Sequence, residues 1–567
     1  MKALDADPVH SIMHAVTIIS AAYTGKRDKN DWLPMANTLQ RGLEIALPYW
    51  IKKRTTAKYP PPEEPIEGIL EDLIFMSHYY MARDILYYTY NSPGSFEWEF
   101  SPDSIRIKFF DPSIPRQFMA YANAVYLDRA DVIHGFKDSA AEICTTLRGQ
   151  EELGDGPHIQ HAFPLIRREA DLRLKGKFSI LDAIDDVIEL NGYTYADFRA
   201  TYQHLFEKAL YHRYFARANN LPWPTYTFSK SGLVSEISIN TGIDASVVEL
   251  ILADISYGPI TNDPHPMNYG IIDHPDSPDY FIIAERMIDQ DGYTQLLRAQ
   301  ASRSPANFST HISGPLGTAL VSHCASFFQE AGFLTLSNVH LRDVDPQAPD
   351  IDLLVISREP TLGYCVFACE VKATLPAFWA KDYLRALRQD SLTKAFKQTN
   401  KVRSVLSTRA GYELIVNRIL SADPNPLTDG VIVIRTLIVT SQNSGMFFEE
   451  ESQTQAIIDY RTLSRIVDAS DGDVVYLLEK LYGVREMFTP STATLSFQLD
   501  NVTVQYEVVA DNPILEFEKT TWRSDGTDVQ VTEQFLAEGR PRGCTCSSPR
   551  HEARDDCPAF RTDSSTE

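Results

Sequence analysis

Two apolar runs separated by a short turn restrict the folds open to this chain more strongly than any other segment. They lie in residues 349–373, PDIDLLVISREPTLGYCVFACEVKA, and their Val, Ile and Phe content around a Pro/Gly turn predicts a β-hairpin. The charges are unexpected for a buried hairpin, because Asp352 begins the first run while Glu370 and Lys372 end the second. Since the open ends of a hairpin lie together, we expect these three side chains to converge.

The hairpin is part of a series of elements expected between residues 311 and 442. Side chains alternate between the two faces of a strand, so Glu370 and Lys372 share one face while Val371 points to the other. The predicted order is α-β-β-β-α-β, made of a helix at 316–331, a strand at 333–341, the two hairpin strands, an amphipathic helix at 380–406 and a buried strand at 430–440.

Two carboxylates and one ammonium group are costly in a protein core unless something binds there. Carboxylate and carbonyl oxygens suit a hard divalent cation, so Asp352, Glu370 and the main-chain carbonyl of Val371 predict a site for Mg²⁺ or Mn²⁺. Such an ion polarises a phosphoryl oxygen and lowers the pKa of a bound water. Lys372 can orient that water or stabilise charge that develops on the phosphate. The residues therefore predict hydrolysis of a phosphodiester.

The motif PDID followed by EVK, in this order of elements, resembles the PD-(D/E)XK nuclease superfamily. The closest likeness is to its restriction-endonuclease-like branch, which includes Mrr-type enzymes and Holliday-junction resolvases. The resemblance implies that Asp352 and Glu370 are metal ligands and that Lys372 is the catalytic lysine. Asp350 could replace Asp352, which is preferred because it directly precedes the apolar run. The resemblance covers about a quarter of the chain, residues 311–442.

Two further positions are compared with the pattern of this superfamily. Its members often carry a glutamine on the helix after the lysine strand, and Gln398 fits that place, which implies a role in positioning the phosphate. Many members also carry an acid on the first helix, and here the sequence departs from the pattern. Ser322 and His323 stand in the expected region, so the first-helix acid is either Glu330, near the helix end, or absent.

Basic residues are concentrated after the lysine strand. Between Val371 and Ala410 nine basic residues oppose two aspartates, a net charge of +7 in a chain whose net charge is −23. Positive charge beside the expected site is what a phosphate backbone requires, although it is also typical of a solvated helix face. The residues expected to contact nucleic acid, with DNA favoured over RNA, are Lys381, Arg385, Arg388, Lys394, Lys397 and Lys401.

The sequence thus predicts a metal-dependent nuclease, most simply a DNA endonuclease in defence or repair. A non-catalytic nucleic-acid-binding or scaffold protein on a degenerate nuclease fold is the main alternative. A protein-interaction module that avoids nucleic acid is a third possibility. The three charges could also be a structural ion-pair set at the end of the hairpin. His311, His323 and His340 are interpreted as structural residues.

The whole chain is expected to be an α+β multidomain protein, because 567 residues exceed one core. An acidic, mainly helical N-terminal region would restrict access to the site or bind a protein partner. A restriction-endonuclease-like domain follows, then a small segment with a β-hairpin and a disordered tail. The expected boundaries are 1–215 for the helical region, 216–310 for a helical and irregular connection, 311–442 for the nuclease-like domain, 443–520 for the hairpin segment and 521–567 for the tail.

Composition excludes several classes of protein. No window reaches the roughly 18 uninterrupted apolar residues of a membrane span. Seven cysteines in apolar or tail contexts do not form a disulfide framework, which favours a reducing, cytoplasmic setting. A disordered tail is favoured over a zinc site for Cys544, Cys546 and Cys557, because only one pair has the short spacing of structural zinc ligands.

Overall fold

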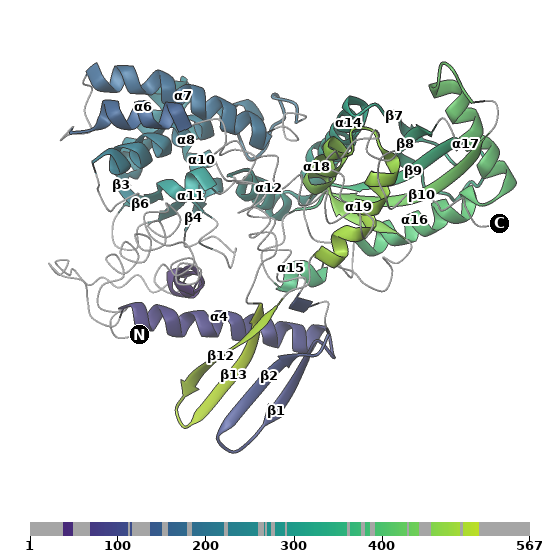
Figure 1. The fold of residues 1–567 in the computed structure, drawn as a ribbon. Helices are drawn as coiled ribbons and strands as arrows, with labels where there is room; N and C mark the ends of the chain where they lie inside the picture. The colour runs from purple at the N-terminus through teal and green to yellow at the C-terminus, as the bar shows by residue number, and fades with distance from the viewer. Residues whose placement is uncertain are drawn as a thin grey trace, which may run out of the picture. The chain divides into compact units, whose positions relative to one another are not determined.

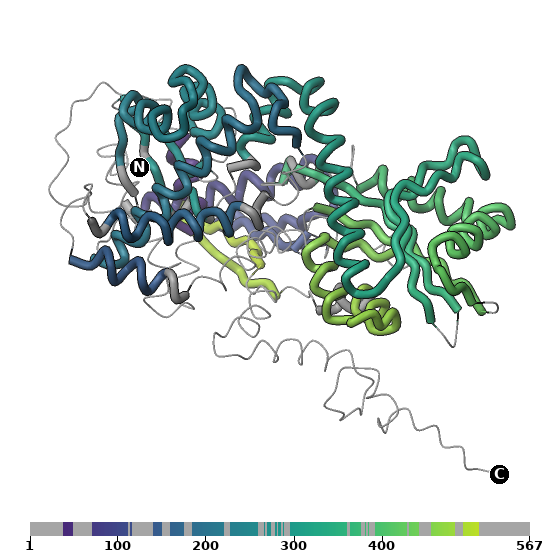
Figure 2. Tube along the Cα trace, turned by 90° about the horizontal axis from the view of Figure 1, so that it is seen from above, coloured from purple at the N-terminus to yellow at the C-terminus, as the bar shows by residue number. Residues whose placement is uncertain are grey.

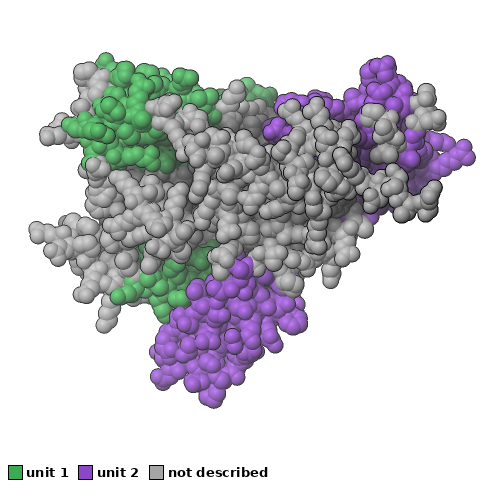
Figure 3. Space-filling model, viewed as in Figure 1, with its two compact units in different colours: residues 1–90, 131–315 green, residues 91–130, 316–567 purple. Residues whose placement is uncertain are grey.

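The chain forms two compact units, residues 1–90 with 131–315 and residues 91–130 with 316–567 (Figure 3). Helices and strands occur in both, so the expected mixture of α and β structure is confirmed. The computed structural model describes residues 38–48, 69–111, 114–115, 137–149, 157–178, 184–219, 225–258, 266, 269–273, 278–289, 292–359, 363–375, 380–385, 392–427, 430–441, 455–487 and 491–509.

Helices make up most of the described first unit (Figure 1). Its long helix α8, Tyr195–Ala218, begins with a capping box, in which the Thr194 hydroxyl accepts from Asp197 N–H and the Asp197 carboxylate accepts from Thr194 N–H. Residues 38–48 are also helical, and further helices are α4 (Ile69–Asn91), α6 (Lys137–Leu147), α7 (Pro157–Phe178), α9 (Lys230–Thr241), α10 (Ala245–Ile255), α11 (Ala284–Asp289), α12 (Gly292–Arg303), α13 (Pro305–Asn307) and the π-helix η3 (Phe308–Ser313).

A four-stranded sheet lies within the region 216–310, with the strand order β3-β6-β5-β4. The sequence predicts a strand at 280–284, which overlaps with β6, and predicts none of the other three. The strands β4 and β5 have two and three residues, too few for alternation to be visible. The bounds are β3 (Thr225–Ser229), β4 (Ser256–Tyr257), β5 (Ile271–Asp273) and β6 (Asp279–Ile283).

Two hairpins from distant parts of the chain form a second four-stranded sheet, with the order β1-β2-β13-β12. The sequence predicts one hairpin with strands at 96–100 and 105–109 and another with strands at 494–499 and 502–509, and both are present. Their association through parallel β2 and β13 is not predicted, because no local pattern encodes it. Alternation places Trp98 on one face, with the neighbouring Glu97 and Glu99 on the other. The bounds are β1 (Phe96–Phe100), β2 (Ser104–Phe109), β12 (Thr492–Leu499) and β13 (Val502–Val509).

The sheet that contains the opening hairpin has five strands in the order β11-β10-β9-β8-β7. The strands β7, β8 and β9 are antiparallel neighbours, whereas β10 and β11 run parallel to β9. Nearly every side chain of β8 and β9 is buried, as both faces of the sheet are covered. The bounds are β7 (Leu334–Val339), β8 (Ile351–Glu359), β9 (Gly363–Lys372), β10 (Val431–Thr440) and β11 (Ala456–Asp459).

Helices cover both faces of this sheet (Figures 1 and 2). On one face Val366 and Ala368 of β9 form a common core with residues of α16 (Leu392–Leu406) and α17 (Arg409–Ala422). On the other face α14 (Gly314–Glu330) and α18 (Tyr460–Ser470) lie together, with the His323 and Tyr460 rings 5.5 Å apart. The helix α19 (Val474–Met487) follows α18 and contacts β11.

Three expectations for this region need correction. The expected helix over 380–406 is described as α15 (Ala380–Arg385) and α16, and residues 386–391 lie outside the described residues. A further helix, α17, separates α16 from β10 and is missing from the predicted order. The sheet also extends past residue 442 through β11, a four-residue strand too short to recognise from its sequence.

The apolar contexts of Cys144, Cys324, Cys365 and Cys369 in the sequence predict buried free thiols. Cys324, Cys365 and Cys369 are buried and free, but Cys144 is half-buried. Within the described residues, none of the helices is both long and apolar enough to pass through a bilayer.

Candidate active site at one end of the five-stranded sheet

The register of the opening hairpin brings Asp352 and Glu370 to the same place. The β8–β9 ladder pairs Leu354 with Ala368 and Leu353 with Cys369, so the next step sets Asp352 opposite Glu370. Alternation puts both carboxylates on the face that carries Leu354 and Ala368, which is the face covered by α16. The predicted convergence of these carboxylates is therefore observed.

At the end of the β8–β9 ladder, the Asp352 side chain accepts a main-chain hydrogen bond in place of a carbonyl oxygen. Its Oδ2 atom accepts a hydrogen bond of 2.8 Å from the N–H of Val371. Burial raises the pKa of Asp352, and the Val371 N–H and Lys372 lower it in part. The second oxygen and the remaining lone pairs are left for another partner, because an ionised carboxylate can accept about four hydrogen bonds.

Glu370 is one of the few buried carboxylates in the core of this sheet, with 2% of its surface exposed. Burial, and then the charge of Asp352, raise its pKa to about 7. The Lys372 ammonium lowers that pKa and forms an ion pair with Glu370 Oε1. One ammonium thus faces two carboxylates, which leaves the group with a negative charge when both acids are ionised.

The donor set suits a hard divalent cation on chemical grounds, since it consists of two carboxylates on adjacent strands at the edge of a core. The part of the chain that the structure describes contains no group of three or more His, Cys, Asp or Glu side chains arranged to hold a metal ion. Asp352 and Glu370 would therefore need the Val371 carbonyl, water or a substrate oxygen to complete a coordination shell. Such a shell is usual for Mg²⁺, which keeps several waters.

Gln398 lies on α16, one helical turn after Lys394. It is half-buried, and its Oε1 atom is buried with no hydrogen-bond partner among the described residues. Lys394 is exposed, and its charge reaches Glu370, where it lowers the pKa. The helix thus brings an amide and a cation to the side of the sheet that carries the carboxylates.

The remaining basic residues divide between the surface and undescribed parts of the chain. Lys397 is exposed on α16 and Lys381 is exposed on α15, whereas Lys401 forms an ion pair of 2.6 Å with Asp345. The residues that lie outside the described chain, or whose side chains do, are Arg385, Arg388, Cys544, Cys546 and Cys557.

The first-helix position remains without an acid on the α16 side. Glu330 is exposed in the last turn of α14, where its Oε1 atom accepts from Ser326 Oγ at 3.5 Å. The helix α14 packs on the opposite face, with Cys324 close enough to raise the pKa of Cys369.

Sequence reasoning missed one group at this end of the sheet. The loop between β7 and β8 brings His340 and Arg342 to Asp350, with distances of 3.0 Å and 3.7 Å to its Oδ2 atom. Asp350 in turn raises the pKa of Asp352. The only sequence signal is the spacing of His340 and Arg342 by two residues, which puts both on one side of an extended segment.

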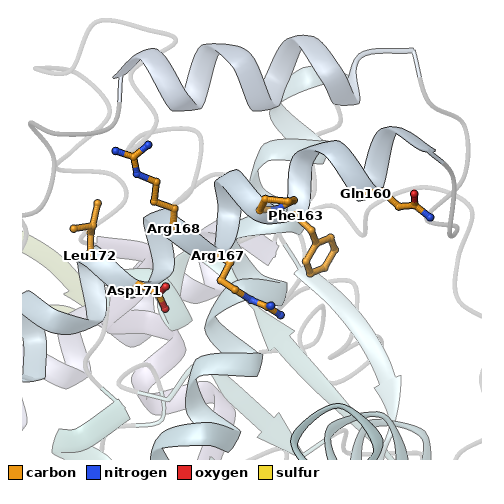
Figure 4. A pocket seen from close by; sticks show the side chains of 7 residues that line it. Gln160, Phe163, Arg167, Arg168, Asp171 and Leu172 are labelled. Atoms are coloured by element: carbon orange, nitrogen blue, oxygen red, sulfur yellow. The ribbon is translucent and has the colours of Figure 1, made fainter.

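A hollow of about 690 Å³ runs along α7 in the first unit (Figure 4). Its described lining comes from this helix alone, with Arg167, Arg168 and Asp171 beside Phe163 and Leu172. Arg167 lies 3.3 Å from Glu207. None of the predicted site residues lines the hollow, and its side chains do not form a pair of buried carboxylates, so it supports no chemistry of the kind expected.

Comparisons with protein families, with curated proteins and with solved structures find no match to this chain. The function must therefore be argued from the site itself.

Proposed function

We propose that this protein hydrolyses phosphodiester bonds of nucleic acid with the help of a divalent cation. The observation that carries the proposal is the placement of Asp352 opposite Glu370, on one face and beside Lys372. Each of these carboxylates has a raised pKa because of burial. A buried acid beside a half-buried one, with a single ammonium in contact, destabilises the protein unless a cation compensates the charge.

The residues have distinct roles in this proposal. Asp352 and Glu370 hold Mg²⁺ or Mn²⁺, together with the carbonyl of Val371. The ion would polarise a phosphoryl oxygen of the substrate and lower the pKa of a water molecule bound to it. Lys372 keeps a positive charge beside the phosphate and stabilises the negative charge that develops on it. Gln398, with an unpaired buried Oε1 atom, positions the water or the phosphate.

The expected substrate is DNA rather than RNA, in a protein that acts in defence or repair. The exposed stripe of α16 supports a phosphate-binding role, because Lys394, Lys397 and Lys401 follow one another at helical spacing. Lys394 is the member of this stripe that acts on the site directly, through its effect on Glu370.

The test uses the purified full-length chain with supercoiled, branched and single-stranded DNA, in Mg²⁺ or Mn²⁺ and in EDTA. We expect metal-dependent cleavage of at least one substrate and its loss, by about 100-fold or more, in Lys372→Ala, with DNA binding retained. Lys230→Ala is the matched control, because Lys230 also pairs with a strand-end acid, Asp273, at 2.8 Å. Cleavage by Lys372→Ala at the wild-type rate would overturn the proposal.

A second candidate is a non-catalytic nucleic-acid-binding protein on the same fold. The absence of a group of three metal-ligating side chains from the described residues favours it. It predicts DNA binding that is unaffected by metal, with no cleavage of duplex, branched or single-stranded DNA.

A further inference from the structure

The loop from His340 to Asp350 runs along the same end of the sheet as the carboxylate pair. It leaves β7 after Val339 and enters β8 at Ile351, directly before Asp352. Asn338, the residue that the register would set opposite Asp352, has a left-handed backbone with φ of 54°. This conformation is uncommon outside glycine and is best tolerated by asparagine. This irregularity within β7 therefore lies beside the site.

Internal bonds hold this loop in one conformation. The N–H groups of Val344 and Asp345 donate to Leu341 O at 2.9 Å and 3.0 Å, and Leu341 is fully buried. Asp345 also pairs with Lys401 at 2.6 Å, which ties the loop to α16. Because both ends and the middle are anchored, the exposed side chains of the loop are presented from a fixed backbone.

Arg342 is the most exposed of the three charged groups that meet on this loop. Its side chain is 71% exposed, and its Nη2 atom lies 3.7 Å from Asp350 Oδ2, beyond hydrogen-bond distance. His340 occupies the same oxygen at 3.0 Å. The Asp350 carboxylate therefore attracts Arg342 electrostatically without accepting a hydrogen bond from it. The guanidinium N–H groups of Arg342 stay available to bind a phosphate in a bidentate manner.

We propose that Arg342 binds a phosphate of the nucleic-acid strand on the side of the site opposite Lys394, and that Asp350 and His340 position it. The inference rests on the proposed nuclease function and adds the path that the nucleic-acid strand takes across the protein. The strand crosses the end of the sheet between Lys394 and Arg342. Asp350 is then a positioning residue for Arg342 and not the metal ligand that the sequence left as an alternative to Asp352.

The experiment measures DNA binding by the full-length chain as a function of salt. Each phosphate contact contributes about 0.9 to the slope of log K against log salt on duplex DNA. We expect Arg342→Ala to lower the slope by about one and Arg342→Lys, which keeps the charge, to retain it. The matched control is Arg358→Ala, because Arg358 lies on β8 near its other end, at 3.6 Å from Asp423. The control should leave the slope unchanged.

Asp350→Asn separates positioning from metal binding. We expect KM for cleavage to rise several-fold with kcat nearly unchanged, since the reacting groups stay in place. A fall in kcat as large as that of Glu370→Gln would make Asp350 a ligand and would overturn the positioning role. An unchanged salt slope in Arg342→Ala, in a protein that binds and cuts DNA, would overturn the phosphate contact alone. Absence of binding and cleavage in the wild type would overturn the proposed function, and this inference with it.

Discussion

Two strand-end acids with lysine partners can be compared within this molecule. Asp273 ends β5 and pairs with Lys230 at 2.8 Å, one acid with one ammonium. Glu370, near the end of β9, also pairs with its lysine, Lys372, but Asp352 adds a second acid on the same face. The first pair has one acid for one ammonium, whereas the second combines two carboxylates with Lys372, and the charge of Lys394 also reaches it. We propose that the first group is a structural ion pair and that the second holds a metal ion.

Cleavage should give the largest difference between the two groups. Glu370→Gln removes a proposed metal ligand while it keeps the shape of the side chain, so we expect a loss of cleavage on the order of 100-fold or more. Asp273→Asn makes the same chemical change in the other group and should leave cleavage unchanged. Metal-dependent cleavage rates of the two purified variants test this directly. Equal rates in both variants would remove the distinction between the groups.

The pH dependence of the free energy of unfolding should differ between the Glu370 group and the Asp273 group. Each unit of pKa shift corresponds to about 1.4 kcal/mol, so the shift of Glu370 contributes roughly 3 kcal/mol at most. The pKa of Glu370 is raised to about 7 from its ordinary value of 4.5, so the folded state binds this proton more tightly than the unfolded state. The resulting stabilisation is complete below pH 4.5 and is lost as the pH rises through about 7. Asp352 has a raised pKa and acts in the same direction.

Urea unfolding in EDTA at pH 5 and pH 8 provides the measurement. We expect the wild type to lose more stability between these values than Glu370→Gln does. The variant should be the more stable protein at pH 8, since it lacks the buried charge. Asp273→Asn should instead lose stability, because it leaves Lys230 without its ion pair. A change in the free energy of unfolding that has the same sign in Glu370→Gln and Asp273→Asn at pH 8 would contradict the comparison.

Surface charges of the β1-β2-β13-β12 sheet should have the smallest effect. Glu99 and Lys108 form an ion pair on the polar face, where alternation alone explains their presence. Lys108→Ala should therefore produce no measurable shift in Tm and no change in cleavage. A clear fall in the Tm or in the cleavage rate of Lys108→Ala would show that strand-end placement is a poor guide to function in this chain.

The sequence predicted the parts of the site that depend on local pattern. Apolar runs and a Pro/Gly turn were enough to predict β8 and β9, and period-two alternation set Glu370 and Lys372 on one face. Pairing in the ladder then required only that the connection lie between Glu359 and Gly363, which are paired. Gln398 was correctly expected on the following helix, although nothing local shows that its Oε1 atom is buried.

Other features depend on contacts that no local pattern reveals. The strand β11 has four residues and is recognised only by its pairing with β10. The hairpin β12–β13 joins a sheet with β2, about 400 residues earlier, and the sequence of neither hairpin encodes that choice. The approach of Arg342 to Asp350 likewise follows from the path of the loop after β7, and the left-handed backbone of Asn338 within that strand is not encoded by a local pattern.

The central claim is that Asp352 and Glu370 bind one divalent cation between them, and calorimetric titration of Mn²⁺ into the full-length chain at pH 8 tests it most directly. We predict a binding event in the wild type and in Asp273→Asn that is lost in Asp352→Asn and in Glu370→Gln. A wild-type chain that takes up no Mn²⁺, or a Glu370→Gln chain that binds it as tightly as the wild type, would contradict the account.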